Sequence, residues 1–264
     1  MKMCVLMAHV PDTASAVKVG PGGDRIDETG LKWIVSPYDE FALEEALKLK
    51  EAHAGSVTVV AYGPERVAAG LRECLARGAD TAAHIAGGDA VFGDALAIAR
   101  VLAAAVERLG PFDLIFTGVK GVGSDNSLVP AMVAEFLDLP HVSGVVKLDV
   151  GGDGLTAQRE IEGGYEVVES PLPCVLAAHK GLNEPRYPSL KGIMAAKRVQ
   201  IQTLSPAELG LDESGLAGNG ARCRWRSLEL PPAKAGGAIL DGQSDPVGAA
   251  KELVRLLREQ AKAV

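Results

Sequence analysis

Residues 112–137 read FDLIFTGVKGVGSDNSLVPAMVAEFL and join a largely apolar segment, a glycine-rich loop and a helical segment. The apolar segment, 112–117, is typical of a parallel strand buried on both faces. Residues 128–137 then carry the pattern of a helix. A strand followed by such a helix predicts a parallel α/β sheet, in which ligands bind beyond the carboxyl ends of the strands.

The same alternation recurs in the residues before this unit. A further helix is predicted after Ser36, its expected N-cap, with Pro37 at the first helical position and Asp39 in the first turn. The other predicted strands are 3–8, 56–61 and 79–85, and the other predicted helices are 65–76 and 94–109. The pattern therefore predicts a Rossmann-like parallel sheet with right-handed crossovers and helices on both faces.

The pattern changes after residue 141. Residues 142–178 predict antiparallel strands, with turns at 151–154 and 163–164. Beyond Gly210, glycine and proline predict an arm with little core of its own. The arm ends in a helix that Ser244 and Asp245 would cap, Pro246 would start, and Val247, Leu253, Val254 and Leu257 would make apolar on one side. We expect an α/β domain over 1–210 and an arm over 211–264.

Composition excludes several classes of protein. The 264 residues are 47% hydrophobic and carry a net charge of −7 with a pI of about 5.3, which argues against general nucleic-acid binding. The four cysteines form no CxxC pair, so no metal site is expected and free thiols are predicted at Cys4, Cys74, Cys174 and Cys223. The apolar run at the N-terminus is too short for a signal peptide or a membrane span, which predicts a soluble cytoplasmic protein.

Catalysis by this chain is not expected. The sequence contains no GxxxxGK[ST] motif, and no glycine cradle follows the first strand. His9 stands at a strand end, where it could act as a base. The competing interpretation, a histidine packed at the sheet rim, is favoured because no serine or cysteine is placed to form a triad with it.

The loop at 118–127 is the candidate anion site. Gly118, Gly121 and Gly123 allow close backbone approach. Ser124, Asn126 and Ser127 offer hydrogen-bonding groups near a helix N-terminus, where amides and the helix dipole favour a phosphate. The same pattern also occurs in plain strand-to-helix turns.

A second candidate site lies at 181–201, which reads GLNEPRYPSLKGIMAAKRVQI. Two prolines exclude a helix from its first half, and Ser189 can cap a short turn after them. The segment is predicted to lift Tyr187 and Leu190 out of the surface, among basic residues. These basic residues are Arg186, Lys191, Lys197 and Arg198. Such a loop suits transient docking to an acidic partner, and the alternative is a solvated basic loop with one buried leucine.

The strings NEPRYPSL at 183–190 and IMAAKR at 193–198 closely resemble the signature of the electron-transfer flavoprotein β subunit. REIEGGYE at 159–166 and LPCVLAA at 172–178 also match this family, and the resemblance extends from the first strand to about residue 211. It implies a 1:1 partnership with an α subunit that holds most of the redox FAD and around which the C-terminal arm wraps. It further implies that Leu190 seats in a pocket on an acyl-CoA-type or other dehydrogenase, and that electrons pass on to a membrane quinone oxidoreductase.

The resemblance also implies that this chain binds AMP. The matching positions are Ala8, Ser36, Pro37, Tyr38, Asp39, Tyr62, Gly118, Lys120, Gly121, Gly123, Ser124, Asp125, Asn126, Ser127, Leu128 and Val129. The family usually has an acidic run here, followed by Asn-Gln-Thr or Ala-Gln-Val. In this chain Leu128 replaces the polar amide, and Asp125 would repel a nearby phosphate. Two alternatives therefore stay open: a bifurcating member with FAD in this pocket and NADH as donor, and a stand-alone nucleotide-binding protein of stress type.

Overall fold

The computed structural model describes residues 1–88, 93–212, 216, 221–223, 225–233 and 236–263. The chain forms two compact units, Met1–Leu228 and Glu229–Val264. The first unit extends past residue 210, where the sequence suggests a boundary, because Leu211 and Leu216 still pack against its apolar core.

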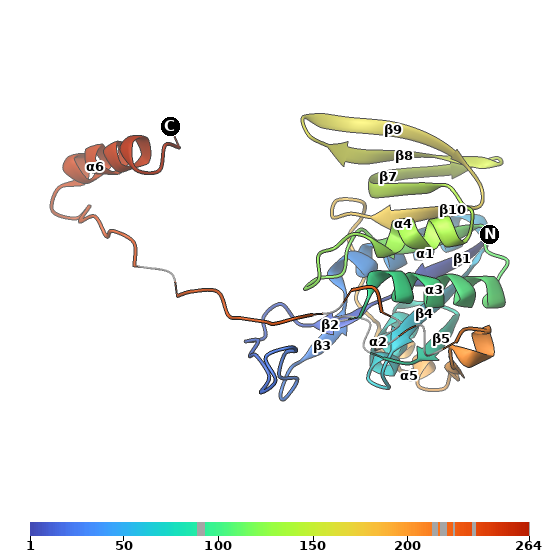
Figure 1. Ribbon diagram of the computed structural model, residues 1–264. Helices are drawn as coiled ribbons and strands as arrows, with labels where there is room; N and C mark the ends of the chain where they lie inside the picture. The colour runs from blue at the N-terminus through green and yellow to red at the C-terminus, as the bar shows by residue number, and fades with distance from the viewer. Residues whose placement is uncertain (89–92, 213–215, 217–220, 224, 234–235, 264) are drawn as a thin grey trace. The chain divides into compact units, whose positions relative to one another are not determined.

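Among the described residues, nine strands form one sheet in the spatial order β11-β5-β4-β1-β6-β10-β7-β8-β9, and β2 and β3 form a separate pair (Figure 1). The large sheet is parallel from β11 to β7, and β8 and β9 extend it in antiparallel fashion. The strands are β1 (Lys2–Leu6), β2 (His9–Pro11), β3 (Trp33–Val35), β4 (Ser56–Gly63), β5 (Thr81–Ala86), β6 (Leu114–Gly118), β7 (His141–Gly151), β8 (Gly154–Ile161), β9 (Gly164–Pro171), β10 (Cys174–Ala178) and β11 (Gln202–Leu204). The predicted α/β fold is confirmed.

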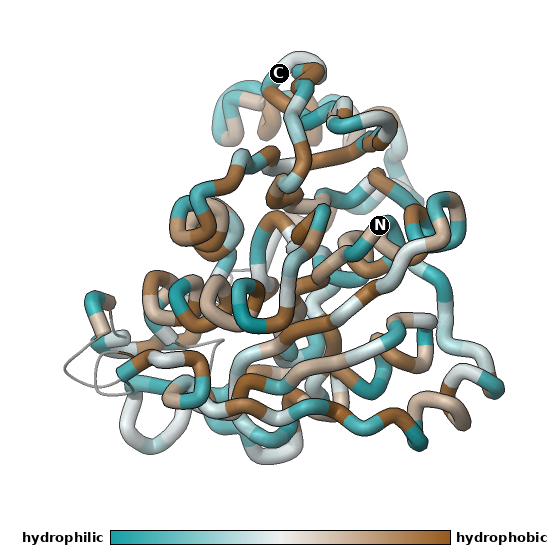
Figure 2. The backbone as a smooth tube through the Cα atoms, turned by 90° about the vertical axis from the view of Figure 1, so that its right-hand side faces the viewer, coloured by the Kyte–Doolittle hydropathy of each residue, from teal (hydrophilic) through white to brown (hydrophobic). Residues whose placement is uncertain are grey.

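Helices cover both faces of the parallel sheet, as the sequence predicts. The helices are α1 (Pro37–His53), α2 (Val67–Arg77), α3 (Ala95–Leu109), α4 (Val129–Phe136), α5 (Leu190–Ala196), the 3-10 helix η1 (Ala207–Leu209) and α6 (Pro246–Glu259). One apolar cluster joins α1 and α2 to one face of the sheet, and a second joins α3 and α4 to the other. Figure 2 shows the apolar residues concentrated along the strands between these layers.

Local sequence explains where the helices begin and end. Asp94 caps α3 by accepting a hydrogen bond from the amide of Leu96. Helix α2 ends at Gly78, whose φ of 129° lies in a region that side chains disfavour. Helix α5 begins at Ser189, whose Oγ accepts a hydrogen bond from the amide of Gly192 at 3.0 Å, as predicted.

Two sequence predictions are wrong in detail. The strand at 174–178 is not antiparallel: β10 lies between β6 and β7 and runs parallel to both. The first strand stops at Leu6, and His9 begins β2, which pairs with β3. Ser36 is the N-cap of α1, as predicted, although its Oγ is buried without a hydrogen-bond partner. Strand pairing and side-chain direction depend on residues distant in sequence, so local patterns miss both.

The second unit contains α6, which begins as the sequence predicts. Asp245 caps it by accepting a hydrogen bond from the amide of Gly248 at 2.9 Å, and Pro246 occupies its first turn. Val247, Leu253 and Val254 are exposed. Within the described parts of the chain, no helix combines the length and apolar character needed to cross a membrane.

Two leucines that differ in burial should differ in their contribution to stability. Leu114 of β6 is fully buried, whereas Leu190 of α5 is largely exposed. Leu114→Ala should lower the free energy of unfolding by about 2–5 kcal/mol, because it removes buried methyl groups and leaves a cavity. Leu190→Ala should change it by less than about 0.5 kcal/mol. Urea unfolding followed by circular dichroism measures both, and equal losses would contradict the assignment of Leu114 to the core.

Candidate functional site

A pocket opens beyond the carboxyl ends of β1, β4 and β6, at the edge where the sequence predicts a ligand. Its cavity volume is about 90 Å³, which is smaller than the usual small-ligand site, and it is partly open to solvent. Its lining is Leu6, Met7, Ala8, Val10, Asp39, Tyr62, Ile98, Leu102, Thr117, Gly118, Lys120, Gly121, Val122, Ser124, Asn126, Val129 and Pro130. The walls are mostly apolar, and the polar groups come mainly from the glycine-rich loop.

The carboxylate of Asp39 holds the inner end of the pocket together. Its two oxygens accept hydrogen bonds from the amides of Ala8 and Gly118, each at 2.7 Å. These amides lie at the ends of neighbouring strands, so one side chain of α1 fixes both. Burial raises the pKa of Asp39 to about 7, although the two hydrogen bonds act in the opposite direction.

Gly118 is required by this arrangement. A Cβ added there would lie 2.6 Å from Oδ1 of Asp39 and 2.6 Å from the Cβ of Tyr38. The sequence suggests Gly118 for close approach of a ligand. In the structure, Gly118 is needed for the close contact between β6 and α1.

The loop after β6 carries the charged group of the pocket mouth. Nζ of Lys120 lies 2.9 Å from Oδ2 of Asp125 and 5.7 Å from the ring centre of Tyr38. Asp125 and Ser127 have φ values of 47° and 52°, in the left-handed region. The side chain of Asn126 accepts a hydrogen bond from the amide of Leu128 at 3.2 Å, which braces the entry into α4.

The structure separates the predicted ligand residues into two groups. Those that line the pocket are Ala8, Asp39, Tyr62, Gly118, Lys120, Gly121, Ser124, Asn126 and Val129. Those outside the lining are Ser36, Pro37, Tyr38, Gly123, Asp125, Ser127 and Leu128. Leu128, which replaces a polar residue of the resembling family, is 46% exposed. Leu128 itself is therefore no part of the pocket wall.

Sequence reasoning missed several apolar wall residues. Ile98 and Leu102 of α3 belong to the pocket lining, but their helical spacing is equally typical of core residues. Val122 and Pro130 lie beside the predicted polar residues. The only sequence signal for these four is their place in the glycine-rich loop or on the helices that flank it.

His9 packs in the interior, in agreement with the favoured interpretation. It is buried in β2, and its ring centre lies 6.1 Å from that of Trp33, over which Arg66 is stacked. Burial lowers the pKa of His9, which keeps the imidazole neutral at neutral pH. His9 is absent from the pocket lining.

The four predicted free thiols are also confirmed: Cys4, Cys74 and Cys174 are buried and Cys223 is exposed.

The loop at 181–201 exposes the two apolar side chains that the sequence singles out. Tyr187 is 92% exposed and Leu190 is 84% exposed. Lys191, Lys197 and Arg198 are exposed as well. Arg186 differs from the expected basic ring because its guanidinium is paired with Glu44 and Glu51 of α1.

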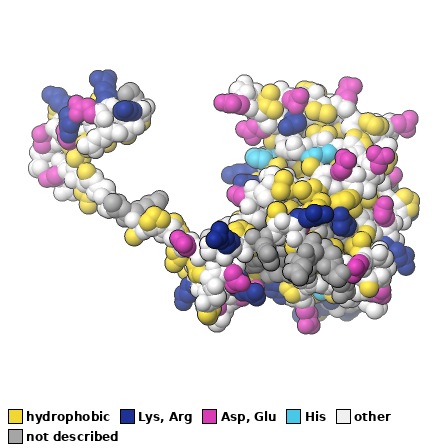
Figure 3. Space-filling view, in the orientation of Figure 1, with side chains coloured by type: hydrophobic (Ala, Val, Ile, Leu, Met, Phe, Trp, Pro, Cys, Tyr) yellow, Lys and Arg dark blue, Asp and Glu magenta, His cyan; other side chains and the backbone are white. Residues whose placement is uncertain are grey.

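A further apolar area lies on the other side of the sheet. Figure 3 shows apolar side chains gathered on the face that carries α3 and α4. Phe136, at the end of α4, is partly exposed there, with the guanidinium of Arg100 5.6 Å from its ring centre. Exposed apolar areas often mark contact surfaces.

Comparison with known proteins gives a consistent result. The family described as "Electron transfer flavoprotein domain" matches residues 25–209. The chain is 39% identical to the electron transfer flavoprotein subunit beta of Bacillus subtilis, with all of both chains covered. It is 37% identical to the subunit of the same name from Thermoanaerobacterium thermosaccharolyticum, covering 92% of this chain and 93% of the relative. It is 34% identical to the subunit of the same name from Megasphaera elsdenii, with 93% of each chain covered.

The buried carboxylate predicts a pH-dependent stability. The folded state binds the proton of Asp39 more tightly than the unfolded chain, in which aspartate titrates near 4, so stability is lost as pH rises from about 4 to about 7. This loss should reach up to about 4 kcal/mol. Asp39→Asn should remove this pH dependence and lower stability by about 1–3 kcal/mol at pH 5, because its NH₂ group faces one of the two amides. Urea unfolding across pH 4–8 measures both effects, and parallel curves for the two proteins would contradict the assignment.

Proposed function

This chain belongs to the electron transfer flavoprotein family as a β subunit, and we propose that it binds AMP, docks an electron-donating dehydrogenase and helps to hold the redox FAD of a heterodimer. The family consists of electron carriers, and its β subunits pair with an α subunit. The observation that carries the docking role is the exposure of Leu190 at the tip of a structured loop. An exposed leucine among lysines and an arginine offers an apolar anchor, and the basic side chains would attract an acidic partner on approach.

The chemistry of the pocket lining supports AMP as the ligand. Its apolar walls suit a purine ring, and the hydroxyl of Ser124, the amide of Asn126 and the ammonium of Lys120 suit a phosphate near the start of α4. Lys120 must then turn from Asp125 to the phosphate. Asp39, when ionised, would repel a phosphate, so we assign the ribose and base to the part of the pocket beside it. In this position AMP stabilises the fold and takes no part in electron transfer.

FAD supplies the redox chemistry when bound, by taking up electrons from the donor and releasing them to the acceptor. We assign most of its binding site to the α subunit, and to this chain a part of the flavin's surroundings. The acceptor in this proposal is a membrane quinone oxidoreductase.

The C-terminal arm is proposed to wrap around the α subunit. Helix α6 contains no buried residue among those described, although Val247, Leu253 and Val254 are apolar. An amphipathic helix with this face exposed needs a surface to cover. The apolar area over α3 and α4 supports a partner in the same way.

The nucleotide content of the heterodimer tests the proposal. Denaturation of the complex, co-expressed with its α subunit, should release one FAD and one AMP. Two FAD and no AMP would indicate the bifurcating alternative, and FAD alone would mean that the β pocket binds no nucleotide. Failure to form a stable 1:1 complex would favour the stand-alone alternative.

Two substitutions at the pocket mouth should have opposite effects on the affinity for AMP. Lys120→Met should weaken AMP binding about tenfold, because it removes a charged partner of the phosphate. Asp125→Asn should leave affinity equal or higher, because it frees Lys120 and removes a negative charge. Titration calorimetry of the AMP-free heterodimer measures both, with FAD content as the control. Equal behaviour of the two variants would exclude Lys120 as a phosphate ligand.

Two exposed leucines should separate docking from assembly. Leu190→Ala should raise the KM for the dehydrogenase about 10- to 100-fold without loss of FAD, since it deletes an anchor that becomes buried on docking. Leu253→Ala, on α6, should instead weaken association of the subunits. Flavin reduction kinetics and analytical ultracentrifugation measure the two effects. Loss of FAD in Leu190→Ala would show that the loop is structural and that docking is wrongly assigned.

A further inference from the structure

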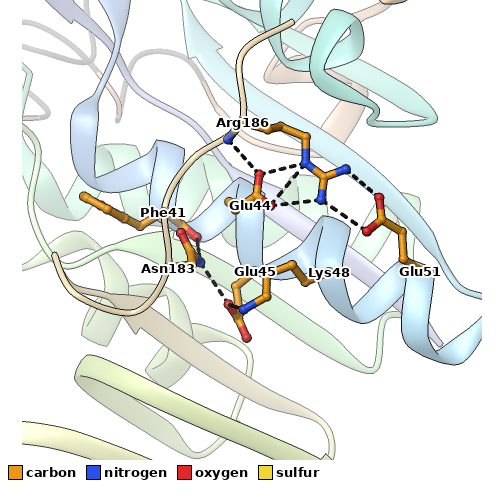
Figure 4. A network of polar contacts seen from close by, with 7 residues as sticks. All are labelled: Phe41, Glu44, Glu45, Lys48, Glu51, Asn183 and Arg186. Carbon is orange, nitrogen blue, oxygen red and sulfur yellow. Dashed lines mark hydrogen bonds and ion pairs between the residues drawn. The ribbon is translucent and has the colours of Figure 1, made fainter. Parts of the chain in front are cut away.

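Helix α1 contains two neighbouring buried glutamates, Glu44 and Glu45, which are 6% and 5% exposed. Charged side chains are rarely buried without dedicated partners, because desolvation of the charge is costly. In this chain both carboxylates bind one distant segment, residues 183–186, and Glu45 also pairs with Lys48 of its own helix (Figure 4).

Glu44 binds both the backbone and the side chain of Arg186. Its carboxylate accepts hydrogen bonds from the Arg186 amide at 3.0 Å, from Nε at 2.9 and 3.1 Å, and from Nη2 at 2.9 Å. Glu51, two turns further along α1, accepts from Nη1 and Nη2. The guanidinium thus lies between two carboxylates of one helix, a geometry that a lysine cannot reproduce.

Asn183, three residues before Arg186, is also bound by α1. Nδ2 of Asn183 donates to Oε2 of Glu45 at 2.9 Å and to the backbone oxygen of Phe41 at 3.0 Å. Figure 4 shows these contacts beside those of Arg186, along the same side of α1. The loop is therefore attached to α1 at two points before it reaches Tyr187.

The other end of the loop is attached to α2. The guanidinium of Arg72 donates to the backbone oxygen of Ala196, the last residue of α5, and to that of Val199, just after the helix. Gly192 lies so close to α2 that an added Cβ would stand 2.2 Å from the backbone oxygen of Ala76. Helix α5 is thus held against α2 by a close contact and by two hydrogen bonds.

We propose that Glu44, Glu45, Glu51 and Arg72 form a clamp that holds the loop in its docking conformation before a partner arrives, and that Arg186 is a positioning residue within it. The inference rests on the proposed docking function, since it explains how Leu190 is presented. A loop fixed at both ends loses little conformational entropy on binding, which strengthens docking without any added contact.

The same geometry removes Arg186 from the basic ring that faces the partner. Its positive charge lies between two carboxylates, so it adds no net positive potential to the surface. The ring that steers an acidic partner is reduced to Lys191, Lys197 and Arg198.

The test uses the FAD-loaded heterodimer and an acyl-CoA dehydrogenase reduced by its acyl-CoA substrate. Glu44→Gln changes a buried group that a partner cannot touch, and Arg186→Lys keeps the charge but loses the two-sided geometry. Each should raise the KM for the dehydrogenase about tenfold with kcat unchanged, and should speed hydrogen exchange of the amides at 186–198. Glu40→Gln is the matched control, because Glu40 lies on the same helix but pairs with Arg77.

A double-mutant cycle with Leu190→Ala completes the test. If the clamp acts by positioning Leu190, Glu44→Gln should add little to the loss already caused by Leu190→Ala. Additive losses would overturn the clamp, as would wild-type KM and exchange in both Glu44→Gln and Arg186→Lys. If Leu190→Ala itself leaves the KM unchanged, the docking function fails and the inference fails with it.

Discussion

One buried carboxylate, that of Asp39, joins α1 to the ends of two central strands. Asp39 binds the amides of Ala8 and Gly118, which follow or end two adjacent central strands, and in doing so fixes the start of α1 against the sheet. Both the pocket and the position of α1 follow from this interaction. The short side chain of aspartate reaches both amides at once. Because these amides are buried away from water, they need such a hydrogen-bond partner.

Helix α1 links the two candidate sites. Its first turn supplies Asp39 to the pocket, and its later turns supply Glu44, Glu45 and Glu51 to the loop that carries Leu190. A helix is a rigid rod on the scale of a domain, so its two sets of contacts cannot move independently. Through α1, any displacement at the pocket is therefore coupled to the loop that carries Leu190.

Much of the fold could be predicted, because the signals are local. Continuous apolar runs separated by helical segments are typical of parallel sheets, and the cap of α5 was predicted from Ser189 alone. The place of β10 could not be predicted, since its apolar residues suit an edge or a centre equally well. About half of the predicted ligand residues line the pocket. The apolar wall from α3, including Ile98, could not be told from core by its spacing.

The alternation of strands and helices and the glycine-rich loop can be predicted from the sequence alone, because each depends on residues adjacent along the chain. The exposure of Leu190, the inward turn of Arg186 to α1, the missing side-chain hydrogen bond of Ser36 and the position of Leu128 outside the pocket lining follow only from the folded structure. The direction of a side chain is decided by partners elsewhere in the fold. For Arg186 these are carboxylates 142 and 135 residues away in the chain.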